Sequence, residues 1–342
     1  MHSNSIGRKL IQTHPYGVGI AGVGKYLPDE NISNSQVEEW TNLDAGFIEE
    51  KTGIRNRRRA GQSEVASEMA AKAARDAISM AGITPEDLGL IITCSFTGDY
   101  VYPAVSCKIQ ELLGAKNAGA FDVMANCTGF QVGLSVASDR MMFDPAIEYV
   151  LVIGVALQSR FINWSDPSSA IYFGDGAGAA VLKRVPAGYG FLAHEITANG
   201  KAFEAVRMRG GGSSFPLRKE NIDQGLQFYE LNGIEVWKQV IQFQPKAIAK
   251  SLEKINKTTS DVDFFILHQA NLRLIEYLMA KMRQPMTKTI VNMMEYGNTA
   301  DASIAIALCD AVSEAKLKRD DLVVISGVGA GFIFGSSVLK WY

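Results

Sequence analysis

The segment 121–133, F-D-V-M-A-N-C-T-G-F-Q-V-G, places a cysteine where nucleophilic chemistry is possible. An apolar run that ends at Val123 precedes Cys127, and small and apolar residues at helical spacing follow it. If the run is a strand and the second part a helix, the Cys127 sulfur lies at the positive end of a helix dipole, where a thiolate is stabilised. A thiolate accepts acyl groups, so one interpretation is a nucleophile that carries an acyl chain. The other is a small, buried hydrophobic residue without chemistry.

Two polar residues in the second half of the chain are candidates to assist this nucleophile. His268 ends the strand-like run 262–268, and Asn298 lies in the turn-type sequence 296–299. Each has an ordinary structural explanation, as a hydrogen-bonded histidine at a strand end or an asparagine that forms a turn. Their combination with Cys127 favours chemistry, because a thiolate nucleophile needs a partner that handles protons and a donor that polarises a carbonyl.

The elements that must position these residues recur in both halves of the chain. The apolar runs Leu88–Cys94 and 262–268 are alike, and each is followed about 60 residues later by a second run, Tyr149–Ala156 and 322–328. Each second run leads into a glycine-rich turn and a further strand. This order predicts an internally duplicated α/β fold in which corresponding strand ends meet. The two expected halves are 1–183, which carries Cys127, and 184–342, which carries His268 and Asn298.

Helical periodicity completes the expected elements. Helices are predicted over 64–81, 103–113, 272–282 and 226–254, the last with a break near Pro245. A basic loop over 52–59 is either a solvated surface or a contact for a phosphate-bearing ligand.

Composition argues against several other classes of protein. With 342 residues, 47% hydrophobic residues and a net charge of −2, the chain has the makeup of an ordinary globular protein without a broad basic surface for nucleic acid. Its apolar stretches are too short to span a membrane, and residues 1–13 lack the apolar core of a signal peptide, so we expect a cytoplasmic protein. Four widely spaced cysteines and four histidines, without H-E-x-x-H, argue against disulfides and against a metal site.

Six motifs resemble the β-ketoacyl-acyl-carrier-protein synthase III group of the thiolase superfamily, in that family's order along nearly the whole chain. They are T-G-I-R at 52–55, A-N-C-T-G-F at 125–130, G-D-G-A-G-A-A at 174–180, H-Q-A-N-L-R at 268–273, Y-G-N-T at 296–299 and G-A-G-F-x-x-G-S at 329–336. The resemblance implies a thiolase-like, duplicated α-β-α-β-α five-layer fold. It also implies a homodimer with an active site at the foot of a narrow tunnel.

The same resemblance implies an acyltransferase that condenses two thioesters. Cys127 would take an acyl group from acyl-CoA or an acyl carrier, with the backbone N–H groups of Cys127 and Ala330 as the oxyanion hole. His268 and Asn298 would then hydrogen-bond a malonyl-type thioester on acyl carrier protein while carbon dioxide leaves, and the enolate would attack the acyl group on Cys127. The expected setting is fatty-acid or polyketide-like biosynthesis, with no cofactor besides the thioester substrates.

Substrate-binding residues follow from the resemblance by position. Phe47 and Lys51 would flank the pantetheine and adenine of CoA, and Asn271 would line the tunnel. Tyr102 would enter the acyl pocket of the partner subunit, or else pack in the dimer core. Val328 stands where phenylalanine is frequent in the family, which would widen the site beside His268.

The carrier-protein surface would contain Arg273 with Lys281 or Arg283, whose positive charge suits an acidic partner. Asp301 departs from the family pattern after Asn298, and the sequence offers no explanation for it. Two other functions stay open: a non-decarboxylating acyltransferase or acyl-chain-coupling synthase, and an inactive partner subunit of a synthase.

Overall fold

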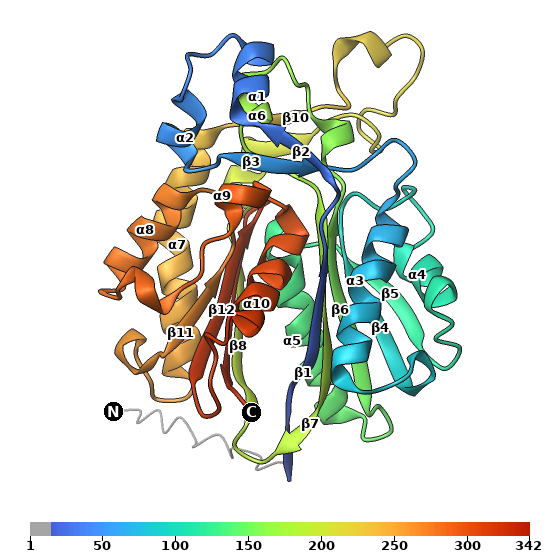
Figure 1. Ribbon diagram of the computed structural model, residues 1–342, viewed down its shortest axis with the longest axis vertical. Helices are drawn as coiled ribbons and strands as arrows, with labels where there is room; N and C mark the ends of the chain where they lie inside the picture. The colour runs from blue at the N-terminus through green and yellow to red at the C-terminus, as the bar shows by residue number, and fades with distance from the viewer. Residues whose placement is uncertain (1–14) are drawn as a thin grey trace, which may run out of the picture.

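The structure, a computed structural model, describes residues 15–342, and most of its strands belong to two sheets (Figure 1). The first sheet has the strand order β1-β7-β6-β4-β5 and the second β11-β12-β13-β8. The first contains β1 (Tyr16–Tyr26), β4 (Leu88–Cys94), β5 (Gly119–Val123), β6 (Tyr149–Ala156) and β7 (Gly176–Pro186). The second contains β8 (Gly190–Ala198), β11 (Phe264–Leu267), β12 (Leu322–Gly329) and β13 (Ile333–Lys340). The expectation about a signal peptide in residues 1–13 lies outside the described residues.

Four strands of each sheet are arranged alike, as the repeated sequence pattern predicts. In the first sheet β4 is parallel to β6, β6 antiparallel to β7 and β7 antiparallel to β1. In the second sheet β11, β12, β13 and β8 repeat these directions in the same order. Strand β5 has no counterpart there and forms an edge of the first sheet. The boundary between residues 183 and 184 stays a prediction; β7 continues to Pro186.

Helices form three further layers around and between the sheets. The central layer contains α5 (Gly129–Phe143) and α10 (Ser303–Ser313); the outer layers contain α3 (Ala66–Ala81) and α4 (Val105–Leu113) on one side and α7 (Gly233–Glu253) and α8 (Leu272–Lys281) on the other (Figure 1). Leu134 of α5 and Ile304 of α10 are fully buried in one core with residues from both sheets, because the central helices are apolar on opposite faces. The expected five-layer α-β-α-β-α architecture is therefore confirmed.

Helix α7 differs from its prediction. The helix continues through Pro245 without the expected break. Proline removes one backbone hydrogen bond and crowds the preceding turn. The buried residues Ala247, Ile248 and Leu252, which belong to the outer core of the second sheet, hold the following turns in place.

A smaller group of elements covers one end of both sheets (top of Figure 1). It comprises β2 (Glu30–Ser33), β3 (Asn56–Arg59), β9 (Val206–Met208), β10 (Tyr229–Leu231), α1 (Asn34–Thr41), α2 (Phe47–Thr52), α6 (Pro167–Ala170) and α9 (Met293–Tyr296). The basic loop contributes β3, and Arg57 is buried there, donating to Asn34 Oδ1 at 2.8 Å and to the Ile171 carbonyl at 3.3 Å. Arg57 therefore has a structural role that neither expectation for this loop included. Within residues 15–342, no helix combines the length and apolarity needed to cross a bilayer.

Candidate active site

Cys127 lies at a strand-to-helix junction, as the sequence predicts. Strand β5 ends at Val123, a 3₁₀ turn covers Asn126–Thr128, and α5 begins at Gly129. Asn126 has a left-handed backbone with φ of 50°, a conformation that asparagine tolerates well. Its side chain donates to the Ala330 carbonyl at 2.9 Å, which ties the cysteine loop to the end of β12.

The surroundings of Cys127 favour the thiol over the thiolate. Burial, and then the charge of the nearby Asp301 carboxyl, raises the pKa of Cys127, although its own backbone N–H acts in the opposite direction. The expectation that this position stabilises a thiolate in the free protein is therefore wrong. The helix dipole is present, but desolvation of the sulfur outweighs it.

His268 follows β11 and is held by one backbone and one side-chain hydrogen bond. Its N–H donates to the Ser326 carbonyl at 3.0 Å, and its Nδ1 hydrogen-bonds with Ser303 Oγ. The Gln269 N–H also donates to Ser303 Oγ, at 3.4 Å, so the serine hydrogen is available for His268 Nδ1. This assigns the ring proton to Nε2. Burial lowers the pKa of His268 to about 4, which keeps the imidazole neutral at physiological pH.

The Asn298 side chain is oriented by its own turn. The Ala300 N–H donates to Asn298 Oδ1 at 2.9 Å, so the carboxamide presents its Nδ2 hydrogens on the other side. The Asn298 backbone carbonyl accepts from Gln158 Nε2 at 2.9 Å and from the Gly174 N–H at 3.0 Å. Two other segments of the chain therefore fix this turn.

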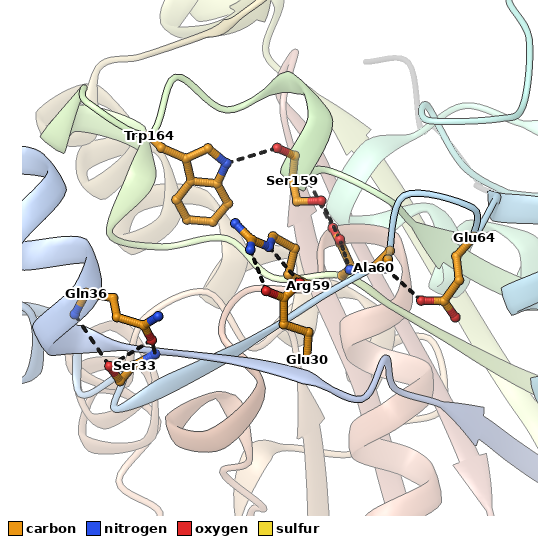
Figure 2. A network of polar contacts seen from close by, with 10 residues as sticks. Glu30, Ser33, Gln36, Arg59, Ala60, Glu64, Ser159 and Trp164 are labelled. Atoms are coloured by element: carbon orange, nitrogen blue, oxygen red, sulfur yellow. Dashed lines mark hydrogen bonds and ion pairs between the residues drawn. The ribbon is translucent and has the colours of Figure 1, made fainter.

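A polar network next to this turn connects it with the β2–β3 ribbon. Asp175, from the G-D-G motif, is fully buried and accepts from the N–H groups of Ala60 at 2.8 Å, Gln158 at 2.7 Å and Ser159 at 2.9 Å. Figure 2 shows the neighbouring contacts, in which Trp164 donates to the Ser159 carbonyl at 3.2 Å and Arg59 approaches Glu30. The motif is thus structural: it supports Gln158, which in turn holds Asn298.

Cys127, His268 and Asn298 line a single cavity with an empty volume of about 620 Å³, including its open mouth. Val328 and Ala330, from the sequence-predicted set, line it as well. The remaining walls are largely apolar and come from α7, α8 and the β9–β10 region: Val206, Leu231, Val236, Val240, Gln244, Leu274, Ile275 and Leu278, with Phe173, Ala270 and Phe332. Sequence reasoning misses these walls, because helical spacing alone does not distinguish a cavity face from a core face.

The other predicted binding residues lie outside this cavity lining. Asn271 is the N-cap of α8 and donates to the Lys51 carbonyl at 3.3 Å, directly after the cavity residue Ala270. The Lys51 ammonium lies 5.8 Å from the centre of the Phe47 ring. These residues form one patch next to the cavity.

Three cationic side chains lie on or beside α8 and are exposed, namely Arg273, Lys281 and Arg283. Arg273 also contacts the Glu50 carbonyl, at 3.3 Å, which connects α8 with α2. Tyr102 lies elsewhere, in the segment between β4 and α4, with 84% of its surface exposed.

Comparison with known proteins agrees with this geometry. Family models described as 3-oxoacyl-[acyl-carrier-protein] synthase III and its C-terminal part match residues 121–200 and 252–341. The chain is 39% identical over 323 residues to a β-ketoacyl-[acyl-carrier-protein] synthase III of Clostridioides difficile, covering 94% of this chain and 98% of that one.

Two solved structures extend the comparison to the fold. The 3-oxoacyl-[acyl-carrier-protein] synthase III of Aquifex aeolicus superposes with a TM-score of 0.87 at 34% identity, covering 95% of this chain and all of that one (100%). A priming β-ketosynthase from a polyketide biosynthetic pathway superposes with a TM-score of 0.87 at 29% identity, covering 98% and 99% of the two chains.

Proposed function

Because this chain belongs to the β-ketoacyl-acyl-carrier-protein synthase III family of condensing acyltransferases, we propose that it joins an acyl thioester to a malonyl-type thioester on acyl carrier protein. The reaction releases carbon dioxide and lengthens the acyl chain by one malonyl-derived unit, in fatty-acid or polyketide-like biosynthesis. The observation that carries this proposal is the single cavity shared by Cys127, His268 and Asn298.

In the first half-reaction Cys127 takes the acyl group. Its sulfur forms a bond to the thioester carbon, the bond from that carbon to the donor thiol breaks, and the thiol proton of Cys127 leaves with the donor. The backbone N–H groups of Cys127 and Ala330 stabilise the oxyanion. The hydrogen bond from Asn126 to the Ala330 carbonyl supports this role, because it holds the two backbone segments together.

In the second half-reaction the malonyl-type thioester loses carbon dioxide. The Nε2–H of His268 and the Nδ2–H of Asn298 donate to its thioester carbonyl as negative charge develops on that oxygen. The resulting enolate carbon forms a bond to the acyl carbon on Cys127, the bond from that carbon to the sulfur breaks, and the departing thiolate takes up a proton from solvent. A neutral imidazole suits this role, because it remains a donor across the physiological pH range.

The substrates reach the cavity from the patch beside α8. Phe47, Lys51 and Asn271 contact the CoA or carrier-bound pantetheine, and the apolar walls accept an alkyl chain. The cationic side chains of Arg273, Lys281 and Arg283 attract the acidic carrier protein. The reaction needs no bound cofactor and no metal, and we place the enzyme in the cytoplasm.

A homodimer completes the enzyme. Strand β5 is an edge strand, and Phe121 on it and Met124 just after it are 39% and 72% exposed. Tyr100, Val101 and Tyr102 add a further apolar surface with exposed fractions of 76%, 92% and 84%. Exposed apolar groups next to an unpaired strand edge favour pairing with a second copy. In that dimer Tyr102 reaches the partner's acyl pocket.

One assay separates the possible activities. The protein is incubated with acyl-CoA and malonyl carrier protein labelled in the carboxyl group that leaves. Release of labelled carbon dioxide with a ketoacyl product supports the proposal. Acyl transfer without decarboxylation indicates the alternative acyltransferase or chain-coupling synthase, and no reaction indicates an inactive partner subunit.

Variants assign the roles of the three cavity residues. Cys127→Ala should abolish the acyl-enzyme, seen as a mass adduct on the intact protein. His268→Ala and Asn298→Ala should still load acyl groups but fail to condense. Cys107→Ala is the matched control, since this exposed thiol lies outside the cavity lining and its loss should change neither step. Loss of loading in a folded His268 or Asn298 variant would contradict this division of roles.

A further inference from the structure

Asp301 is a buried carboxyl group with no partner in the described part of the chain. It lies in the 3₁₀ turn Ala300–Ala302, between Asn298 and α10, and is 0% exposed. Neither of its side-chain oxygens makes a hydrogen bond within residues 15–342. The contrast with Asp175 is direct, because that equally buried carboxylate accepts several hydrogen bonds. A buried carboxylate without hydrogen-bond partners is energetically costly, so its position calls for an explanation.

The Asp301 carboxyl lies against the start of the helix that follows the nucleophile. A Cβ atom placed on Gly129, the first residue of α5, would be 2.5 Å from Asp301 Oδ1 and 3.1 Å from the Cβ of Cys94. The first turn of a helix exposes backbone N–H groups and attracts negative charge. Cys127 lies in the 3₁₀ turn two residues before Gly129, and the charge of Asp301 acts on its thiol.

We propose that Asp301 and Cys127 share one negative charge at the start of α5, so that the Asp301 carboxyl controls when the Cys127 thiol can ionise. A carboxylate and a thiolate at one helix end exclude each other, because each raises the free energy of the other's charged form. Asp301 is a positioning residue in this scheme, since it acts through Cys127. The inference deepens the proposed function and takes from it the role of Cys127 as nucleophile.

The titratable groups around the pair are all neutral or acidic. They are Cys94 on β4, Tyr229 on β10 and His268 after β11, together with Asp122 of β5, whose charge acts on Cys94, and Asp175, whose charge acts on Tyr229. Gly154 of β6 packs against the backbone of Asp301. Burial raises the pKa of Asp301 well above its usual range, and Asp301 in turn raises the pKa values of Cys127 and Cys94. Burial, followed by the charges of Cys127 and Asp301, also raises the pKa of Tyr229. No cation among these groups offsets a second negative charge.

This coupling has a consequence for the catalytic cycle. In the free enzyme Cys127 stays a thiol, which protects it from oxidants and alkylating agents, because the thiolate is the reactive form. Once the sulfur carries an acyl group it no longer ionises, and the competition ends.

The test measures Cys127 directly and needs no acyl substrate. The rate of Cys127 alkylation by iodoacetamide is followed by peptide mass between pH 6 and pH 10, in the wild type and in Asp301→Asn. We expect the profile of the variant to move to lower pH by about one unit or more, which is about a tenfold faster reaction at a fixed pH below the midpoint. The exposed Cys107 in the same samples is the internal reference.

A matched control removes a different carboxylate near the same helix. Asp139→Asn changes an exposed residue of α5 about 15 Å or more along the helix from Cys127, and it should leave the profile unchanged. An unchanged Cys127 profile in folded Asp301→Asn would overturn the proposal. If Asp301→Asn shifts the Cys127 alkylation profile but the wild type does not condense thioesters, only the proposed function is contradicted. If the wild type condenses thioesters and Asp301→Asn leaves the profile unchanged, only the charge sharing is contradicted.

A second measurement does not depend on an Asp301 variant. The infrared carbonyl band of the protonated Asp301 carboxyl should disappear at lower pH in Cys127→Ala than in the wild type. In this variant no thiolate at position 127 competes with Asp301 for the negative charge. Identical titration of that band in the two proteins would also overturn the proposal.

Discussion

The Nδ1 atom of His268 and the Oγ of Ser303 are hydrogen-bonded, which connects the end of β11 to the first residue of the central helix α10. The serine also accepts the Gln269 N–H, so its hydroxyl hydrogen points toward the imidazole. One hydroxyl group thus sets both the orientation and the tautomer of the ring. Asn298 lies five residues before Ser303, so the short segment 298–303 helps to position both proposed donors.

Removal of this hydroxyl should affect condensation but not acyl loading. In Ser303→Ala the imidazole loses one hydrogen bond, worth about 1 kcal/mol, and can adopt the other tautomer. We expect the decarboxylation rate to fall about tenfold, with acyl loading on Cys127 within about twofold of the wild type. Ser303→Thr keeps a hydroxyl and should restore most of the rate. An equal loss of loading and condensation would indicate a general structural defect instead.

Val328 should determine how much room the cavity offers beside His268. Both residues line the cavity, and Val328 is 7% exposed. In Val328→Phe the larger ring should reduce loading of branched or long acyl donors by about tenfold or more, while acetyl loading changes little, because one methylene group in an apolar pocket already shifts binding by about 1–3 kcal/mol. Competition between acyl-CoA donors, read as mass adducts on Cys127, measures this ratio. Val328→Ala is the control, in which loading of branched or long donors relative to acetyl should rise. An equal loss of loading for all donors in Val328→Phe would contradict the prediction.

The position of the three central residues is predictable because the signals are local. Apolar residues up to Val123 and helical residues from Gly129 define the junction that holds Cys127. His268 and Asn298 likewise follow recognisable sequence patterns, a strand in one case and a turn in the other. The repeated strand order then predicts that the three residues lie close together, because corresponding strand ends of duplicated sheets meet.

The features that sequence reasoning misses depend on distant packing. The ionisation of Cys127 is predicted in the wrong direction, since the helix dipole is local whereas desolvation and the charge of Asp301 come from the other half of the chain. The sequence places Arg57 in a basic loop that we expect to be a solvated surface or a phosphate contact. The fold instead buries Arg57 next to α6 and α1. Ser303 has no distinguishing pattern; only the approach of α10 to β11 gives it a partner.

Acid should destabilise the fold through His194, a residue of β8. Burial, and then the charge of Lys254, lowers the pKa of His194 to about 4. An unfolded histidine takes up its proton near pH 6.5, so between pH 6.5 and 4 the unfolded state binds more protons and stability falls as pH falls. By pH 5 the loss from this residue is about 2 kcal/mol.

Urea unfolding at pH 7 and pH 5 measures this loss. His194→Gln should lose less stability than the wild type over this interval, by about 2 kcal/mol, because glutamine does not titrate there. It can also keep a hydrogen bond to Ser337, whose Oγ lies 2.8 Å from His194 Nδ1. Equal losses in the two proteins would show that His194 is already protonated or exposed in the native state.

The apolar edge next to Cys127 should hold two copies together. Phe121 lies on the edge strand β5 and is partly exposed. In a symmetric dimer Phe121→Glu places two unpaired carboxylates in the interface, and each costs about 2–5 kcal/mol when buried without a partner. We expect the dissociation constant to rise at least about a hundredfold, seen by light scattering as a monomer at micromolar concentration.

The control for this variant is an aromatic residue of similar character elsewhere. Phe143, at the end of α5, is 83% exposed, and Phe143→Glu should leave the dimer intact. If Tyr102 of one subunit completes the acyl pocket of the other, the monomeric Phe121→Glu protein should also load long acyl donors less well than acetyl, relative to the Phe143→Glu protein. A wild-type protein that is already a monomer, or a Phe121→Glu protein that remains a dimer, would contradict the assignment of this edge as the subunit interface.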